Sequence, residues 1–130
     1  MDRLEFYRET IEKVLRGHAE IPYSYGKIDE YLIVDRERNH FLLLDVGWQQ
    51  KRRVHGCLTH VQIIDGKMSL GLARIATAML PSLSAKIWIQ RDGIEDGVTE
   101  ELVEAGIPKS DIVLGFIPEE VRVHTGYAIA

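Results

Sequence analysis

Two stretches of strand-forming sequence constrain the fold of this chain more than any other feature. The first covers residues 41–64 and the second covers residues 86–93. Within the first, segments 41–46 and 54–64 are rich in β-branched, aromatic and aliphatic residues, which favour a pleated and half-buried surface. The polar run Gln49-Gln50-Lys51-Arg52 separates the two segments, as the turn of a hairpin does. We therefore expect an antiparallel ribbon against which the rest of the chain packs.

One domain is expected to take up the whole chain, residues 1–130. A chain of 130 residues can bury a core without disulfides or a structural metal, and 45% hydrophobic with 28% charged residues is typical of soluble globular domains. The single Cys57 excludes an intrachain disulfide, and the charged opening MDRLEFYRE lacks the pattern of a secretion signal. We expect a cytoplasmic protein that spans no membrane.

The charge balance bears on nucleic-acid binding. A formal net charge of −4 disfavours DNA binding by the whole surface, because proteins that hold duplex DNA use excess lysine and arginine to replace its counterions. Lys51-Arg52-Arg53 is a run of three positive charges that can still contact phosphates locally. A solvated hairpin tip is also usually polar and exposed, so both interpretations of the run stay open.

Helical patterns precede and follow the ribbon. Apolar residues at spacings of three and four predict an amphipathic helix over 3–16, with Asp2 as N-cap and Gly17 at the C-terminus. A second helix is expected near 98–106, with Thr99 as N-cap and Gly106 at its end. The apolar stripe of the first helix consists of Leu4, Tyr7, Ile11, Val14 and Leu15.

The remaining pattern predicts a single α+β domain with an antiparallel sheet of about 4–6 strands. In the strand over 53–64, alternation places Val54, Leu58 and Ile64 on one face and Cys57, Val61 and Ile63 on the other. Gly47 and Gly56 suggest bulges or close backbone approach. The expected strands are 28–34, 40–48, 53–64, 87–90 and 112–116, with a turn at 36–39, a helical turn at 118–121 and a candidate edge strand at Tyr127 and Ile129.

Residues 68–85 look like an insertion into a hairpin. Asp65-Gly66 is a strong two-residue turn signal, yet the return strand begins only at Ile87. The inserted sequence predicts a short helix over about 69–79, and its length with Arg74 and Pro81 argues against a membrane span. An apolar arm left in water is an aggregation liability, so we expect self-association or a partner contact. Its apolar stripe consists of Leu72, Ile75, Met79 and Leu80.

The residue types that carry chemistry do not form a convincing set. Cys57 and His60 are three apart, which on a regular strand points them to opposite faces and argues against a metal site or a Cys–His nucleophile. Asp45, Asp65 and Lys67 superficially resemble a Mg²⁺-dependent nuclease set, but turn geometry already explains Asp65. We expect no catalytic residues, no metal and no cofactor.

Several sequence blocks resemble one known family. They are IPYSYG (21–26), DVGWQQKRRVHGC (45–57), KIWIQRDG (86–93) and ELVEAGIPKSDIVLGF (101–116), followed by TGYAIA (125–130) at the end of the chain. In this order they are similar to the XisI-like family, cyanobacterial proteins known as fdxN element excision controlling factors. The resemblance covers nearly all of the chain except residues 68–85, where such proteins pass directly from the turn into the next strand.

The resemblance implies a role in excising a DNA element during heterocyst differentiation, together with a site-specific recombinase and an XisH-like companion that resembles nucleases. It carries over no catalytic residues. We therefore expect a non-enzymatic controlling factor that binds an XisH-like protein, with homo-oligomers left open; the alternatives are a DNA-binding accessory factor that uses the basic hairpin tip, and a metal-dependent nuclease. Tryptophan and arginine dominate interface hot spots, although both tryptophans also suit a core. The candidate partner or DNA contacts are Trp48, Lys51, Arg52, Arg53, Trp88 and Arg91.

Overall fold

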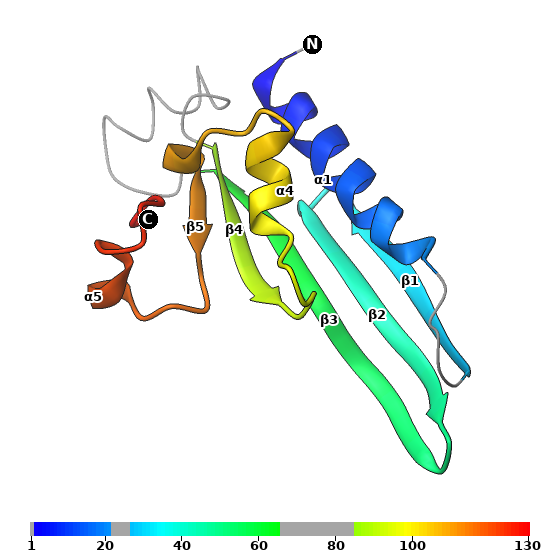
Figure 1. Cartoon of the computed structure of the whole chain (residues 1–130). Helices are drawn as coiled ribbons and strands as arrows, with labels where there is room; N and C mark the ends of the chain where they lie inside the picture. The colour runs from blue at the N-terminus through cyan, green and yellow to red at the C-terminus, as the bar shows by residue number, and fades with distance from the viewer. Residues whose placement is uncertain (1, 22–26, 66–84) are drawn as a thin grey trace.

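The computed structural model of the chain describes residues 2–21, 27–65 and 85–130. It consists of one five-stranded sheet with the strand order β1-β2-β3-β4-β5 and helices packed against it (Figure 1). Neighbouring strands are antiparallel except for β4 and β5, which are parallel. The elements are α1 (Arg3–Ala19), β1 (Lys27–Asp35), β2 (His40–Gln49), β3 (Arg52–Asp65), β4 (Ala85–Asp92), α4 (Thr99–Glu104), η2 (Lys109–Asp111), β5 (Ile112–Leu114) and α5 (Glu119–Arg122).

Helices α1 and α4 lie on the same face of the sheet, and the core fills the space between them and the strands (Figure 1). Strand β2 shows why: its residues alternate between buried and half-buried, with Phe41 and Leu43 fully buried. On α1 the predicted stripe supplies Tyr7, Ile11 and Leu15, all buried. The prediction of an α+β fold with an antiparallel sheet and an N-terminal helix is therefore confirmed, except that β5 pairs with β4 in parallel.

The faces predicted for β3 were partly wrong because β3 contains a bulge. Leu43 pairs with Thr59 and Leu44 pairs with Cys57, so Leu58 is an extra residue in the ladder. A bulge reverses the alternation beyond it, since two residues face one partner residue. Cys57 consequently lies on the face opposite to Val61, and Leu58 packs against the core instead.

The two glycines of the β2–β3 hairpin differ in their surroundings. A Cβ atom added at Gly47 would overlap the carbonyl oxygen of Lys27 on β1, so this glycine permits the close backbone approach expected from the sequence. A Cβ atom at Gly56 would have no described atom within 4 Å. The bulge lies at Leu58 and not at Gly56.

The predicted N-terminus of α1 is confirmed, whereas its predicted C-terminus is wrong. The Asp2 carboxylate accepts a 2.8 Å hydrogen bond from the backbone N–H of Glu5. The helix continues through Gly17 to Ala19, and Glu20 is the C-cap. The extra turn is anchored by a 2.6 Å contact between His18 Nε2 and Glu101 Oε1 on α4, which offsets the cost of about 1 kcal/mol for a glycine inside a helix.

Helix α4 begins one residue earlier than its predicted cap, Thr99, would place it. Val98 is the N-cap, and Thr99 is the first helical residue. The capping oxygen comes from the preceding strand: the Asp92 carboxylate accepts from the N–H of Val98 at 2.9 and 3.1 Å and from the hydroxyl of Thr99 at 3.2 Å. Gly106 follows the helix with a positive φ of 111°, as predicted for its end.

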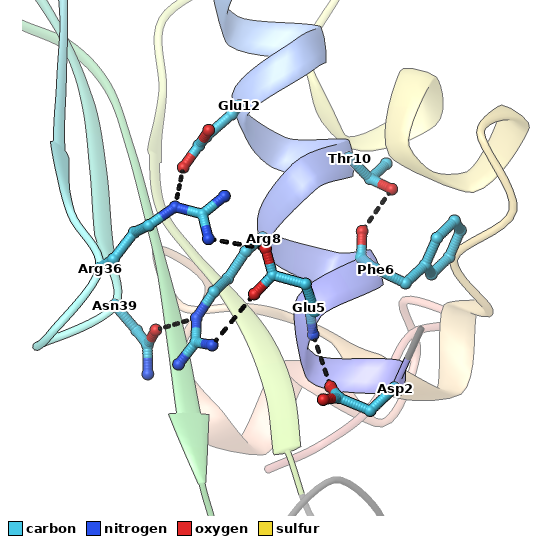
Figure 2. A network of polar contacts seen from close by, with 8 residues as sticks. All are labelled: Asp2, Glu5, Phe6, Arg8, Thr10, Glu12, Arg36 and Asn39. Carbon is cyan, nitrogen blue, oxygen red and sulfur yellow. Dashed lines mark hydrogen bonds and ion pairs between the residues drawn. The ribbon is translucent and has the colours of Figure 1, made fainter.

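The β1–β2 turn, predicted at 36–39, is held against α1 by a polar network (Figure 2). Arg36 donates to Glu12 at 2.8 Å and to Glu5 at 2.7 Å, and Arg8 donates to Asn39 at 2.9 Å. The Arg36 guanidinium is the main reason that the pKa of Glu5 lies below its usual value. The network fixes the helix across the end of the first hairpin.

The C-terminal region completes the sheet edge. Strand β5 and the single turn of α5 match their predicted positions, but the edge strand expected at Tyr127 and Ile129 is reduced to one isolated bridge between Ala128 and Val113. Residues 66–84 lie outside the described part of the chain. The predicted helix over 69–79 and the self-association arm of Leu72, Ile75, Met79 and Leu80 therefore remain predictions.

Candidate functional site

The sheet face opposite the helices carries exposed apolar side chains, and we call it the open face. Tyr31 and Ile33 on β1 are 49% and 44% exposed, and Trp48 on β2 is 49% exposed. They share one face because Tyr31 pairs with Leu44 and Ile33 with Leu42, two strand positions of the same parity as Trp48. Exposed apolar side chains gathered on one face are typical of an interaction surface.

Trp48 and Arg53, both predicted contact residues, form a pair on the open face. They lie opposite each other in the β2–β3 ladder, and the Arg53 guanidinium carbon is 5.3 Å from the centroid of the Trp48 ring. Arg53 also donates a 3.3 Å hydrogen bond to the carbonyl oxygen of Gly47. The arginine is thus held over the aromatic ring while both side chains remain exposed.

Trp88 lies on the open face but is half-buried by the C-terminal region. The guanidinium carbon of Arg122 is 5.1 Å from its ring centroid, and Arg122 also donates to the carbonyl oxygen of Ile117 at 3.0 Å. The two tryptophans are far apart, because their β3 partners Arg53 and Gln62 are nine residues from each other, roughly 30 Å at about 3.3 Å per residue. A single contact surface that includes both tryptophans must therefore reach across this whole distance.

Three predicted arginines surround a single hollow of about 280 Å³. Arg52 and Arg53 come from the start of β3, and Arg91 comes from the end of β4. The hollow lies along β3 where β4 no longer pairs with it, since the β3–β4 ladder begins only at Thr59. Lys51 is exposed in the adjacent turn. The structure thus gathers positive charge here although the whole chain carries a net charge of −4.

Cys57 also lines this hollow but is poorly suited to nucleophilic chemistry. Burial is the main cause that raises the pKa of its thiol, and the Asp45 carboxylate adds to this while the Arg91 charge opposes it. A thiol with a raised pKa remains protonated at neutral pH and is a weak nucleophile. The hollow, which Asp45 lines together with the three arginines, is therefore poorly suited to covalent catalysis by Cys57.

The acidic residues of the nuclease hypothesis are not brought together. Asp45 lies opposite Gly56 in the sheet, whereas Asp65 is nine residues further along β3, roughly 30 Å at about 3.3 Å per residue. Lys67 falls outside the described residues. Within the described ranges, no group of three or more histidine, cysteine, aspartate or glutamate residues is placed to hold a metal ion.

Cys57 and His60 lie on the same face of the sheet, so the prediction that they point to opposite faces was wrong. Because of the bulge at Leu58, both residues lie on the open face, Cys57 opposite Leu44 and His60 opposite Leu42. His60 pairs instead with His40, whose Nδ1 is 3.0 Å from His60 Nε2, and the two rings stack. Burial, followed by the charge of His40, lowers the pKa of His60.

Sequence reasoning missed this histidine pair and the contact between Arg122 and Trp88. The signal for the pair was present, because an antiparallel hairpin brings His40 and His60 onto adjacent strands once its register is known. The Arg122 contact joins residues from elements that have no sequence pattern in common, so nothing in the sequence indicated it.

These features define a small α+β protein built on a single sheet, with one face packed by α1 and α4 and with exposed apolar side chains on the other. The family model for the XisI protein matches residues 1–79 and 80–129. The chain belongs to the XisI family.

Solved structures agree with this assignment. A XisI-like protein from Anabaena variabilis is 34% identical, with a TM-score of 0.76, over 98% of this chain and 99% of its own. The fdxN element excision controlling factor XisI from Anabaena variabilis is 32% identical, with a TM-score of 0.72, over 99% of this chain and 100% of its own. No curated protein matches the chain. No helix among the described residues is long and apolar enough to cross a membrane.

Proposed function

We propose that this chain is a non-enzymatic controlling factor for excision of a DNA element, and that it acts in the cytoplasm by binding an XisH-like protein through its open face. The observation that carries the proposal is the exposed Trp48 ring with Arg53 held over it. The excision role rests on family membership and on the relative named as an fdxN element excision controlling factor.

The open face suits a protein partner for energetic reasons. Tryptophan, tyrosine and arginine supply most hot-spot energy, and they are most effective when apolar neighbours exclude water around them. Here Trp48 has Arg53 beside it, and Tyr31 and Ile33 continue the apolar surface across β1. Covering these side chains removes apolar area from water at about 25 cal/mol per Å².

The arginines around the hollow add a preference for an acidic partner surface. Arg52, Arg53 and Arg91 approach one hollow from two strands, so a carboxylate of the partner can meet several guanidinium groups at once. Charge complementarity of this kind mainly increases the association rate and the selectivity for the partner. The contact is therefore expected to weaken with added salt.

Co-purification with an XisH-like protein tests the proposal. Arg53→Glu and Arg52→Glu are each expected to weaken binding at least tenfold, because each reverses a positive charge that lines the hollow. Arg38→Glu is the matched control: Arg38 is an exposed arginine at the β1–β2 turn, away from the hollow, and is expected to leave binding unchanged. Undiminished binding by both hollow variants would remove these arginines from the interface.

A second candidate function is direct DNA binding by the hairpin tip, favoured by the gathering of Arg52, Arg53 and Arg91 around one hollow beside Lys51. It predicts that the affinity for duplex DNA falls steeply as salt is added. This salt dependence should become weaker as each phosphate contact is lost. Replacing Lys51, Arg52 and Arg53 with glutamine should then abolish DNA binding while the protein stays folded.

A further inference from the structure

Strand β1 is an edge of the sheet and lacks the short length, the bulge and the proline that protect many edges from pairing, although it carries charged side chains. It is 9 residues long, pairs with β2 along its entire length without a register shift, and pairs with no other described strand. Natural sheets usually shorten, bulge or interrupt such a strand with proline, because its unpaired N–H and C=O groups recruit another strand. β1 contains no proline.

The sequence of β1 is complementary to itself when it is read in the opposite direction. If Tyr31 is placed opposite Tyr31 of a second copy, Lys27 falls opposite Asp35 at both ends of the strand. The remaining directly opposed pairs are Ile28 with Val34, Asp29 with Ile33 and Glu30 with Leu32. Opposite charges face each other at both ends, and no like charges are directly opposed.

Neighbouring registers lack this property. In an antiparallel pair, directly opposed side chains lie on the same face of the sheet, and the outward-pointing backbone groups alternate along each strand. A symmetric pair can therefore change register only by moving its twofold axis from one residue to the next. A shift in one direction places Glu30 directly opposite Glu30 of the second copy. A shift in the other direction places Asp29 opposite Asp35. The register centred on Tyr31 is therefore favoured over both.

We propose that two copies of this chain pair through β1, antiparallel, about a twofold axis that passes between their Tyr31 side chains. The pairing joins the two sheets into one continuous sheet and brings the two open faces side by side. Tyr31, 49% exposed in the single chain, then meets its own counterpart, and aromatic pairs across strands stabilise antiparallel sheets. The Asp35 carboxylate already binds Arg38 at 3.2 Å, and Lys27 of the second copy becomes its second cation.

This dimer can be tested separately from the proposed partner contact: Tyr31 belongs to both surfaces, but the arginines around the hollow take no part in the β1 pairing. In the proposed dimer, residue 31 of one copy lies directly opposite residue 31 of the second copy, and this can be tested by substitution. Light scattering coupled to size exclusion should give twice the mass of one chain for the wild type. Tyr31→Asp and Tyr31→Lys should each elute as monomers, since each places like charges on the axis.

A mixture of the Tyr31→Asp and Tyr31→Lys proteins should recover the dimer, because opposite charges then meet at the axis. Ile33→Lys is the matched control on the same strand and face: it lies opposite Asp29 of the second copy and should remain dimeric. All three substitutions are at half-exposed positions outside the core, so each variant should remain folded, which circular dichroism checks.

Three results would overturn the proposal. One is a wild-type protein that is monomeric at 100 µM, a concentration at which an edge-to-edge dimer of moderate affinity is populated. Another is a dimer that survives both Tyr31 substitutions, which assigns self-association to a different surface. The last is a mixture of the two charged variants that stays monomeric, which rules out the register centred on Tyr31.

Discussion

Gly47→Ala tests the account of how β1 is held against β2. An added Cβ would overlap the carbonyl oxygen of Lys27 and come to 2.7 Å from the Cα of Ile28. An ordinary contact between carbon atoms needs about 3.5–4.0 Å, so β1 must retreat by about 1 Å or more. Both neighbours are backbone atoms, and the strain cannot be relieved by turning a side chain. The first residues of β1 should separate from β2, at a cost of about 1–3 kcal/mol.

Urea denaturation measures this cost, and Gly56→Ala is its matched control. Gly56 lies in the same hairpin, and an added Cβ there meets nothing within 4 Å. With a slope of about 2 kcal/mol per M, Gly47→Ala should lower the unfolding midpoint by about 0.5–1.5 M urea. Gly56→Ala should leave the midpoint unchanged or raise it slightly, because alanine restricts the unfolded chain. Equal midpoints for the two variants would refute the proposed close approach of β1 to Gly47.

Two further predictions concern the core and the histidine pair. Ile11 is fully buried on α1, so Ile11→Leu should cost less than about 1.5 kcal/mol, whereas Ile11→Asp should cost about 4 kcal/mol or more; equal thermal midpoints would place Ile11 on the surface. His60 has a pKa below its ordinary 6.5, so the unfolded chain binds a proton first as the pH falls and stability drops from pH 7 to 5.5. His60→Gln should flatten the unfolding free energy over that range, and a slope equal to that of the wild type would contradict this assignment.

Local patterns in the sequence were enough to predict the strands and the main helix. Each of these elements has one face toward the core and one toward solvent. The alternation in β2 and the three-and-four spacing in α1 therefore show directly in the order of apolar and polar residues. The predicted turn at 36–39 was also local, and its residues now contact the helix.

Features that depend on tertiary contacts could not be predicted in this way. The bulge at Leu58 reverses the faces of β3, and no glycine marks it. The end of α1 was misplaced because His18 gains a partner, Glu101, that is 83 residues away in sequence. Asp92 caps α4 from a different element, so the local sequence pattern pointed to Thr99 instead.

The candidate site was predicted residue by residue, but its arrangement was not. Tryptophan and arginine were chosen for their chemistry, and four of the six, Trp48, Arg53, Trp88 and Arg91, share the open face. Their grouping depends on which strands are neighbours and where β4 ends, which only the fold determines. The arginine hollow is the clearest example, since Arg91 reaches it from a strand that is 38 residues from Arg53 in sequence.

Isothermal titration calorimetry tests the central claim most directly. The full chain is titrated in parallel into an XisH-like protein and into duplex DNA, at the same salt concentration. The account predicts saturable binding to the protein, weakened at least tenfold by Arg53→Glu, and no binding to DNA at physiological salt. Saturable binding to DNA without binding to the XisH-like protein would contradict it.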